Sequence, residues 1–245
     1  MDAILEVRNL TKRFQGLLAI NHVSFMLERN EILGLIGPNG AGKTTMISLI
    51  SGTLEPTEGE VLFEGTPIRQ LPAYRRGRLG IARTFQVMRP FPGLTVLDNV
   101  AVGALFGASG HSRVLRDARD EAQRWLEFVG LDRHAWQRAD SLGGPDRKRL
   151  ELAKVLAMRP KLLLLDEVMA GLNHVEIEEV ITEIKKVRDK GISILVTEHV
   201  MKAIQSLSDR LLVLHHGEKI AEGKPKDVLS KDQVIAAYLG RKRHE

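Results

Sequence analysis

Glycines, a lysine and two threonines near position 40 have the spacing of a phosphate-binding loop, G-x-x-x-x-G-K-[ST]. The apolar run at 32–36 predicts a buried strand before the loop, and residues 45–50 predict a helix after it. A plain glycine-rich turn is the alternative, and this strand–loop–helix context argues against it. The loop residues are Gly37, Pro38, Asn39, Gly40, Ala41, Gly42, Lys43, Thr44 and Thr45.

The residue types of the loop indicate what it binds. Glycines let backbone N–H groups turn toward phosphate oxygens, and the start of the following helix adds partial positive charge. We expect Lys43 to reach the β- and γ-phosphates of a nucleotide and the Thr44 hydroxyl to bind Mg²⁺. The loop by itself therefore predicts a phosphorylated ligand.

A pair of carboxylates, Asp166 and Glu167, directly follows the apolar run at 162–165. Ligands of open α/β sheets bind at the carboxyl ends of the strands, where this pair is predicted to lie. We expect Asp166 to take Mg²⁺, directly or through water, and Glu167 to polarise the water that attacks the γ-phosphate. A solvated acidic pair at the start of a loop is the alternative, which the phosphate loop makes weaker.

The elements that must position these residues alternate along the chain. Short strands are predicted at 3–8, 22–28 and 59–64, so the first third is rich in strands. The last hundred residues alternate helices with continuously apolar strands, as at 162–165 and 192–196. This pattern predicts an α/β fold with a largely parallel sheet covered on both faces.

The middle of the chain has a helical pattern instead. Thr95 to Asp98 is an acidic variant of a capping box, and Ala122, Leu126 and Val129 recur at helical spacing. We therefore predict one domain over residues 1–245. Its α/β core spans 1–86 and 143–245, and a helical subdomain is inserted at 87–142.

Composition limits the remaining possibilities. The chain has 245 residues, of which 43% are hydrophobic and 27% charged, as in soluble globular proteins. The lack of cysteine excludes disulfides and thiolate metal sites. We expect neither a signal peptide nor a membrane span, and hence a cytoplasmic protein.

The net charge of +5 would suit nucleic acid, an anionic membrane surface or a phosphate ligand. Much of the excess is local, and we interpret the local clusters as solvated faces rather than a nucleic-acid site. The clusters are Arg75, Arg76 and Arg78, then Arg147, Lys148 and Arg149, and finally Arg241, Lys242 and Arg243.

Along essentially its whole length the chain resembles the ATP-binding subunit of ATP-binding cassette (ABC) transporters. Besides the two motifs above, four further features occur in the family's order. They are Phe14, the string Thr84-Phe85-Gln86, the string Ala170-Gly171-Leu172-Asn173, and the string Thr197-Glu198-His199. The resemblance implies a P-loop NTPase core with a mainly parallel sheet, an N-terminal antiparallel β region and the inserted helical subdomain.

The resemblance also implies roles for these residues. Phe14 would stack on adenine, and His199 would contact the γ-phosphate. Gln86 would join the Mg²⁺ and water site to the contact with a membrane subunit. The loop Ala170-Gly171-Leu172-Asn173 would cross a dimer interface. ATP and Mg²⁺ are the implied cofactors.

One motif departs from the family pattern. The signature Leu-Ser-Gly-Gly-Gln aligns with Leu142-Gly143-Gly144-Pro145-Asp146, so Gly143 replaces the serine that would bond the partner's γ-phosphate. A lost hydrogen bond to a charged group costs about 1.5–3 kcal/mol. Ser141 would compensate only if the loop shifted by one residue, and Asp146 would repel a phosphate. We expect this chain to complete the partner's site weakly.

Three strings resemble the branched-chain amino acid import group: residues 170–173, residues 197–202, and the ending Val234 to Gly240. The larger ATPase of that group is the nearest match. It implies a second ABC ATPase, identical or different, two integral-membrane permeases and, indirectly, a periplasmic or extracellular solute-binding protein. The protein would lie on the inner face of the cell membrane and bind no nucleic acid.

Other members of the family remain open. Urea and amide importers belong to the same group, and the lipopolysaccharide export ATPase is similar overall. A soluble cassette ATPase acting on nucleic acid or ribosomes is the alternative of a different class. Such proteins usually carry two cassettes or a long coiled-coil insert, and this sequence shows neither.

Overall fold

The computed structural model describes residues 2–84, 90–108 and 114–239, and it divides into two compact units. Unit 1 comprises Met1–Pro72 and Met169–Glu245, and unit 2 comprises Ala73–Val168. The predicted boundaries at 86, 87, 142 and 143 remain a prediction.

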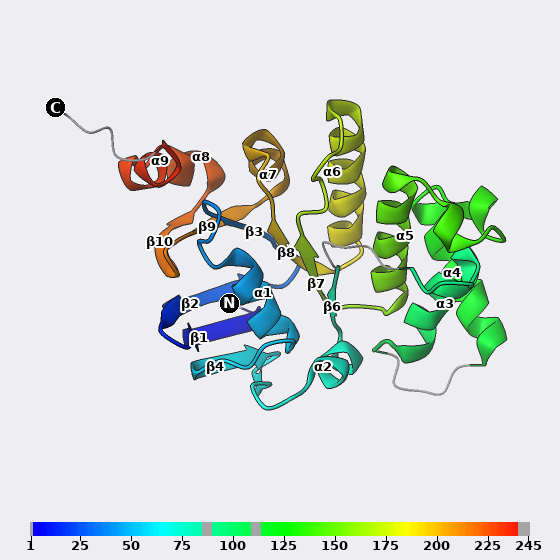
Figure 1. The fold of residues 1–245 in the computed structure, drawn as a ribbon, viewed down its shortest axis with the longest axis horizontal. Coiled ribbons are helices and arrows are strands. Elements are labelled where there is room, and N and C mark those ends of the chain that lie inside the picture. The colour runs from blue at the N-terminus through cyan, green and yellow to red at the C-terminus, as the bar shows by residue number, and fades with distance from the viewer. Residues whose placement is uncertain (1, 85–89, 109–113, 240–245) are drawn as a thin grey trace. The chain divides into compact units, whose positions relative to one another are not determined.

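Unit 1 begins with an antiparallel sheet in the order β2-β1-β4-β5. The first three of these strands lie side by side in Figure 1. Its strands are β1 (Ala3–Phe14), β2 (Leu17–Glu28), β4 (Glu58–Phe63) and β5 (Thr66–Pro67). The first two form a longer hairpin than the predicted strands at 3–8 and 22–28. Asn9 and His22 adopt left-handed φ values of 45° and 47° where the register shifts, and such irregularities interrupt the alternation from which strands are predicted.

A second set of strands in unit 1 follows the order β10-β9-β3-β8. They are β3 (Ile32–Ile36), β8 (Ser193–Thr197), β9 (Arg210–His215) and β10 (Glu218–Gly223). β3 pairs in parallel with both β8 and β9, while β9 and β10 form an antiparallel hairpin. Every residue of β3 and β8 is buried, which explains their continuous apolar sequences.

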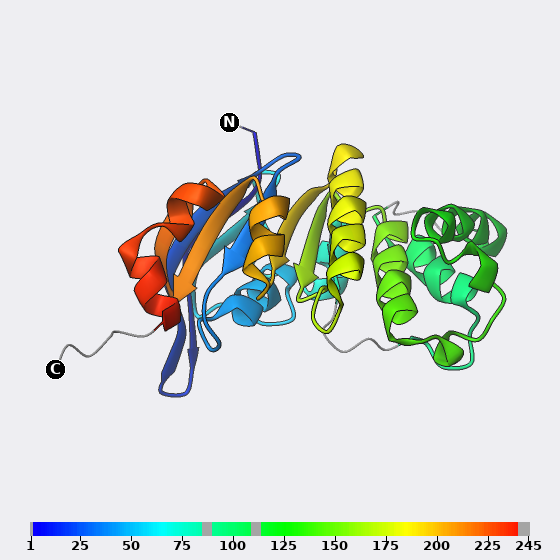
Figure 2. The same cartoon turned by 90° about the horizontal axis from the view of Figure 1, so that it is seen from above.

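Five helices accompany these strands in the described part of unit 1. They are α1 (Lys43–Ser51), α6 (His174–Asp189), α7 (Met201–Leu207), α8 (Pro225–Leu229) and α9 (Asp232–Leu239). α6 and α7 run next to each other in both views (Figures 1 and 2). α6 ends at Asp189, and Gly191 just beyond it has a left-handed φ of 91°, as is common after the end of a helix.

Unit 2 is mostly helical, and α3, α4 and α5 pack against one another (green in Figure 2). Its helices are α2 (Ala73–Leu79), α3 (Val96–Phe106), α4 (Leu115–Phe128), η1 (Asp132–His134), η2 (Ala139–Ser141) and α5 (Gly144–Ala157). Two parallel strands, β6 (Ile81–Arg83) and β7 (Leu162–Asp166), complete it. The predicted α/β fold, with an antiparallel region, a mainly parallel sheet and a helical insert, is confirmed.

One basic cluster is not the solvated face that the sequence suggested. Arg75 and Arg78 of α2 are exposed, but Arg76 between them is only 1% exposed. Burial lowers the pKa of the Arg76 guanidinium below its ordinary value. The interpretation was wrong at this residue because α2 turns one face of its arginine run into the protein. Among the described residues, no helix combines the length and apolar character needed to cross a bilayer.

Candidate functional site

The phosphate loop joins the end of β3 to the start of α1. Gly37 and Gly42 have φ values of 154° and 106°, and a Cβ on either would clash with the surrounding backbone. α1 begins at Lys43 with Gly42 as its N-cap, no capping side chain and no acidic residue in its first turn. The N–H groups of the first turn therefore have no side-chain anion of their own, as an anion-binding helix start requires.

Lys43 is folded into this loop. Its side chain is largely buried, with the residue 6% exposed, and Nζ donates to the carbonyl oxygens of Gly37 at 2.7 Å and Pro38 at 3.0 Å. These contacts fix the ammonium at the centre of the loop, because a buried charge needs hydrogen-bond partners. Thr44 next to it is exposed.

Segments from the C-terminal third support the loop. The N–H of Gly217, in the β9–β10 turn, donates to the Ala41 carbonyl at 3.1 Å, and the Gly217 carbonyl accepts from Asn21 at 2.8 Å. The Tyr238 phenol of α9 is hydrogen-bonded to the backbone of Gly37. Burial raises the pKa of Tyr238 to about 12 despite that bond, so the phenol keeps its proton at neutral pH.

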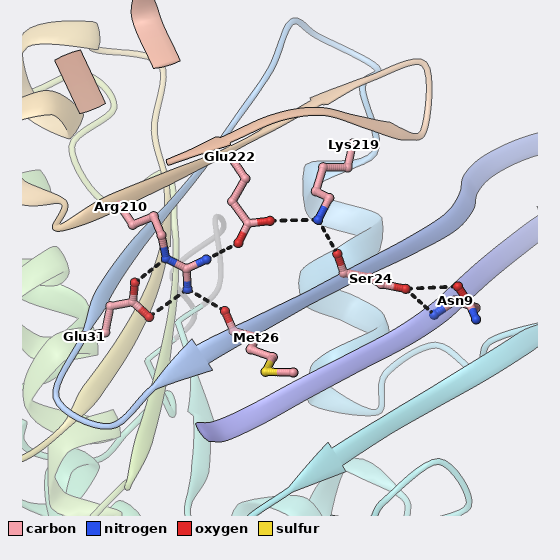
Figure 3. A network of polar contacts seen from close by, with 7 residues as sticks. All are labelled: Asn9, Ser24, Met26, Glu31, Arg210, Lys219 and Glu222. Atoms are coloured by element: carbon pink, nitrogen blue, oxygen red, sulfur yellow. Dashed lines mark hydrogen bonds and ion pairs between the residues drawn. The ribbon is translucent and has the colours of Figure 1, made fainter. Parts of the chain in front are cut away.

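The strand that leads into the loop is anchored at its other end by Arg210, the first residue of β9 (Figure 3). Its guanidinium donates to both carboxylate oxygens of Glu31, at 2.7 and 3.0 Å, and also pairs with Glu222 of β10. A further bond of 2.6 Å reaches the carbonyl of Met26 in β2. One cation thus ties the starts of β3 and β9 to β10 and β2.

The same network continues to the antiparallel sheet (Figure 3). Lys219 donates to Glu222 and to the Ser24 carbonyl, each at 2.7 Å. The Ser24 hydroxyl accepts from the N–H of Asn9 at 2.7 Å, where the first strand is irregular. The left-handed turn at Asn9 is therefore held by a bond to β2.

In unit 2, Asp166 ends β7 as a buried carboxylate, 2% exposed. Arg83 at the end of β6 contacts its Oδ2 through Nη2 at 3.0 Å. The Asp166 N–H donates to the Thr84 hydroxyl at 3.3 Å. Glu167 follows with a left-handed φ of 54°, a conformation that costs a non-glycine residue about 1–2 kcal/mol. Strain of this kind concentrates at functional sites.

Back in unit 1, the segment after β8 contains a second buried carboxylate. Glu198 is 2% exposed, and its Oε1 accepts the N–H of Met169 at 2.8 Å. His199, the predicted γ-phosphate contact, is exposed directly after it. The Glu198 bond ties the end of β8 to the start of the segment that contains the predicted interface loop.

That predicted interface loop is exposed at Ala170, Gly171 and Asn173, with Leu172 half-buried. The Asn173 side chain caps α6 by accepting the N–H groups of Val175 and Glu176 at 2.9 and 3.1 Å. In return, the Glu176 carboxylate accepts the Asn173 N–H at 2.8 Å, which completes a capping box.

The predicted signature surrounds the start of α5. Leu142 is buried, Gly143 and Gly144 are exposed, and Gly143 is the N-cap without a side chain to bond the helix start. The Ser141 hydroxyl donates to the Arg138 carbonyl at 2.7 Å. Its hydrogen atom is therefore already engaged within unit 2, and the structure does not shift Ser141 into the place of the missing serine.

Two predicted residues, Phe14 and Gln86, remain to be placed. Phe14 is 40% exposed at the end of β1, with the Lys12 ammonium 5.1 Å from its ring centroid. Gln86 lies outside the described residues. Arg83 was not predicted as the partner of Asp166, nor Glu198 as the partner of Met169. A signal was present in both cases, because each charged residue stands at the end of an apolar strand.

The donor types fit Mg²⁺. A hydroxyl at Thr44 and a carboxylate at Asp166 are hard oxygen ligands, and Mg²⁺ in nucleotide sites takes one or two carboxylates with substrate phosphates and water. Within the described ranges no group of three or more His, Asp or Glu residues forms a metal cage. Each of these two donor types, taken by itself, therefore suits a metal that arrives with phosphate.

Comparison with known proteins gives two kinds of match. The ABC transporter family model matches residues 20–170. The high-affinity branched-chain amino acid transport ATP-binding protein BraF of Pseudomonas aeruginosa is 38% identical over 249 residues, covering 97% of this chain and 98% of that protein.

Solved structures agree with the sequence match. The ADP conformation of MJ1267, an ATP-binding cassette of an ABC transporter, has a TM-score of 0.89 at 30% identity and covers 98% of this chain and 100% of that one. The dimeric, post-hydrolysis state of the cassette MJ0796 bound to ADP and Pi has a TM-score of 0.81 at 26% identity, covering 90% and 98%.

Proposed function

Because the chain belongs to the ABC transporter family of ATPases, we propose that it is the ATP-binding and ATP-hydrolysing subunit of an importer for branched-chain amino acids. The observation that carries the substrate class is the similarity to BraF over nearly the whole of both chains. The residues assigned below act on ATP rather than on the transported solute, so this part of the proposal rests on the relatives.

The phosphate loop supports the ATP chemistry. Lys43 already lies among the loop carbonyls, and phosphate oxygens are stronger acceptors for an ammonium than carbonyl oxygens are. We assign Lys43 and the N–H groups of α1 to the β- and γ-phosphates, and Phe14 to the adenine. Thr44, Gln86 and Asp166 are the proposed Mg²⁺ ligands, and the ion would neutralise charge on the phosphates.

Hydrolysis is assigned to groups that follow the strands. Glu167 would orient and polarise the attacking water, and His199 would contact the γ-phosphate. The left-handed backbone of Glu167 is consistent with a position kept for function rather than for stability.

The proposed partners are a second ABC ATPase subunit, two integral-membrane permeases and, indirectly, a periplasmic or extracellular solute-binding protein. ATP would clamp two cassettes together, and hydrolysis would release them. The dimeric MJ0796 cassette supports pairing as a property of the family. The subunit would work in the cytoplasm, on the inner face of the cell membrane, without binding nucleic acid.

The first test removes the proposed base. In the assembled transporter, Glu167→Gln should lower ATP turnover by about 10²–10⁴-fold, the usual contribution of a general base. Binding of ATP, measured by equilibrium dialysis, should persist because the phosphate loop is untouched. Glu178→Gln, at an exposed position of α6, is the matched control and should behave like the wild type. Undiminished turnover in Glu167→Gln would refute this role.

The second test addresses the substrate. ATPase activity of the reconstituted complex with its solute-binding protein should rise with leucine, isoleucine or valine. Stimulation by urea or short amides alone would replace the branched-chain proposal and keep the ATPase assignment.

A further inference from the structure

The metal carboxylate proposed above has a cationic partner inside its own unit. Arg83 Nη2 lies 3.0 Å from Asp166 Oδ2, with the two side chains 11% and 1% exposed. A carboxylate taken out of water to this extent needs a charged or hydrogen-bonding partner. Arg83 supplies it from the last position of β6, 83 residues away in the sequence.

The backbone around this pair is held as well. Arg83 is the register partner of Leu164 in the parallel pairing of β6 with β7. Thr84 donates its N–H to the Leu164 carbonyl at 3.0 Å, and its hydroxyl accepts the N–H of Asp166 at 3.3 Å. Two consecutive residues of β6 and its extension therefore fix both the main chain and the side chain of Asp166.

We propose that Arg83 is the positioning residue of the metal-binding carboxylate: it fixes the orientation of the Asp166 side chain for the binding of Mg²⁺ together with nucleotide. The inference rests on the proposed function, in which Asp166 is a ligand of Mg²⁺. A carboxylate has two oxygens and about four acceptor directions, and the guanidinium contact at Oδ2 occupies only part of them. Hydrogen-bonded partners of this kind orient metal ligands, and their loss typically costs 10–100-fold in metal affinity.

Arg83 also has a second effect on metal affinity, which opposes the first. A guanidinium near a bound cation repels it, and this repulsion alone would make the removal of Arg83 strengthen metal binding. We expect the orientation effect to outweigh this repulsion, because the Asp166 carboxylate is almost wholly buried and would have to turn to another hydrogen-bond donor if Arg83 were removed. The direction of the change in metal affinity thus separates the two roles.

The test measures metal binding without turnover. Mn²⁺ serves as the probe, and its binding to the full chain with ADP is followed by electron paramagnetic resonance. Arg83→Gln should weaken Mn²⁺ binding by about 10–100-fold. Arg83→Lys should fall between it and the wild type, because an ammonium keeps the charge but loses the planar fork. ADP affinity in EDTA should be unchanged, since Lys43 and the phosphate loop are intact.

Two controls make the result specific. Arg119→Gln removes another ion pair of unit 2, Arg119 Nε to Asp98 Oδ1 at 2.8 Å, and should leave Mn²⁺ affinity unchanged. In an Asp166→Asn background, Arg83→Gln should cause no further loss of Mn²⁺ affinity, as expected if Arg83 acts through Asp166. Retained ADP binding and an unchanged tryptophan spectrum show that each variant is folded.

Mn²⁺ binding by Arg83→Gln that equals or exceeds the wild type would overturn the inference and leave the ATPase proposal standing. A wild-type protein that binds ADP but shows no Mn²⁺ binding dependent on Asp166 would instead refute the metal assignment in the proposed function. The two failures are therefore distinguishable in one set of measurements.

Discussion

Gly143 is a residue whose surroundings would accept the serine that the family signature has there. Its φ and ψ of −67° and 171° are extended values that any residue adopts, and a Cβ added here would have no atom within 4 Å. A serine at a helix N-cap bonds the N–H groups of the first turn. Among the described residues of unit 2, none therefore enforces glycine at this position. The missing hydroxyl would matter for the proposed partner's site rather than for the folding of α5.

Gly143→Ser should raise the unfolding free energy by a few tenths of a kcal/mol, the usual difference between serine and glycine caps. This is checked by urea denaturation. In the assembled transporter the same change should alter ATP turnover if the site completed by this chain is active. Gly16→Ser is the matched control, since that glycine also faces open space at an ordinary φ. Unaltered turnover would show that the partner's site does not use this position.

Glu198 should matter for stability as well as for the position of its neighbour His199. Glu198→Ala removes the acceptor of the Met169 N–H inside the protein and should cost about 1–3 kcal/mol, the usual penalty for a buried unsatisfied group. Glu198→Gln keeps an acceptor oxygen for the Met169 N–H and should therefore lose less unfolding free energy than Glu198→Ala. Urea denaturation compares the two variants, and equal losses would mean that the bond to Met169 contributes nothing.

At the residue scale, the sequence predicted groups that belong to contiguous motifs and missed those that depend on tertiary contacts. Lys43, Asp166 and Glu167 were predicted because their neighbours in the chain define them. Arg83 and Glu198 lie 83 and 29 residues from their partners, so no local spacing encodes the contact. Gln86 remains a prediction.

At the scale of elements, α3 and α5 approach closely at Gly103. A Cβ at this position would clash with the carbonyl oxygen of Lys154 in α5. The glycine thus lets the two backbones come together, which sets the position of α5 and of the signature residues at its start.

Gly103→Ala should therefore destabilise unit 2 by about 1–3 kcal/mol, because the added methyl forces the helices apart. Both tryptophans, Trp125 and Trp136, belong to unit 2, so their fluorescence during urea denaturation reports this unit. Gly144→Ala in α5 is the matched control. It has open space around it and should be neutral or stabilising, since alanine favours helices more than glycine does. A stable Gly103→Ala variant would contradict the close packing.

Element types were more predictable than element lengths. The buried strands β3, β7 and β8 have continuous apolar sequences and matched their predicted positions. The first hairpin extends to Phe14 because bonds such as that between Asn9 and Ser24 stabilise irregular turns. Those bonds connect different strands, so strand periodicity does not reveal them.

At the scale of the whole molecule, low pH should destabilise unit 2 through the protonation of two carboxylates. A hydrogen bond from Arg119 lowers the pKa of Asp98. Burial by itself raises the pKa of Glu121, but bonds from Arg159 and Trp125 outweigh it and the pKa lies below its ordinary value. Both groups therefore stabilise the folded state above their unfolded pKa values, and this contribution is lost as pH falls through the lowered folded values.

We expect the free energy of unfolding reported by tryptophan fluorescence to fall as pH drops below about 4, the ordinary range of these carboxyls. Glu121→Gln should be less stable than the wild type at neutral pH, and the gap should narrow in acid because the wild type loses the same charge. A gap that is constant from neutral to acid pH would show that the ionised form of Glu121 contributes nothing.

The order in which the chain is made constrains when the phosphate loop can form. Its leading strand, β3, takes its hydrogen bonds from β8 and β9, which begin at Ser193 and Arg210. Unit 2 is encoded between these partners, so more than half of the chain must leave the ribosome after the loop before β3 is flanked on both sides. Contacts this distant in sequence form slowly. Until β8 and β9 have been synthesised, the apolar strand β3 is therefore expected to remain exposed to solvent. A protein truncated before β8 should thus bind chaperones and no nucleotide, although it contains the entire loop.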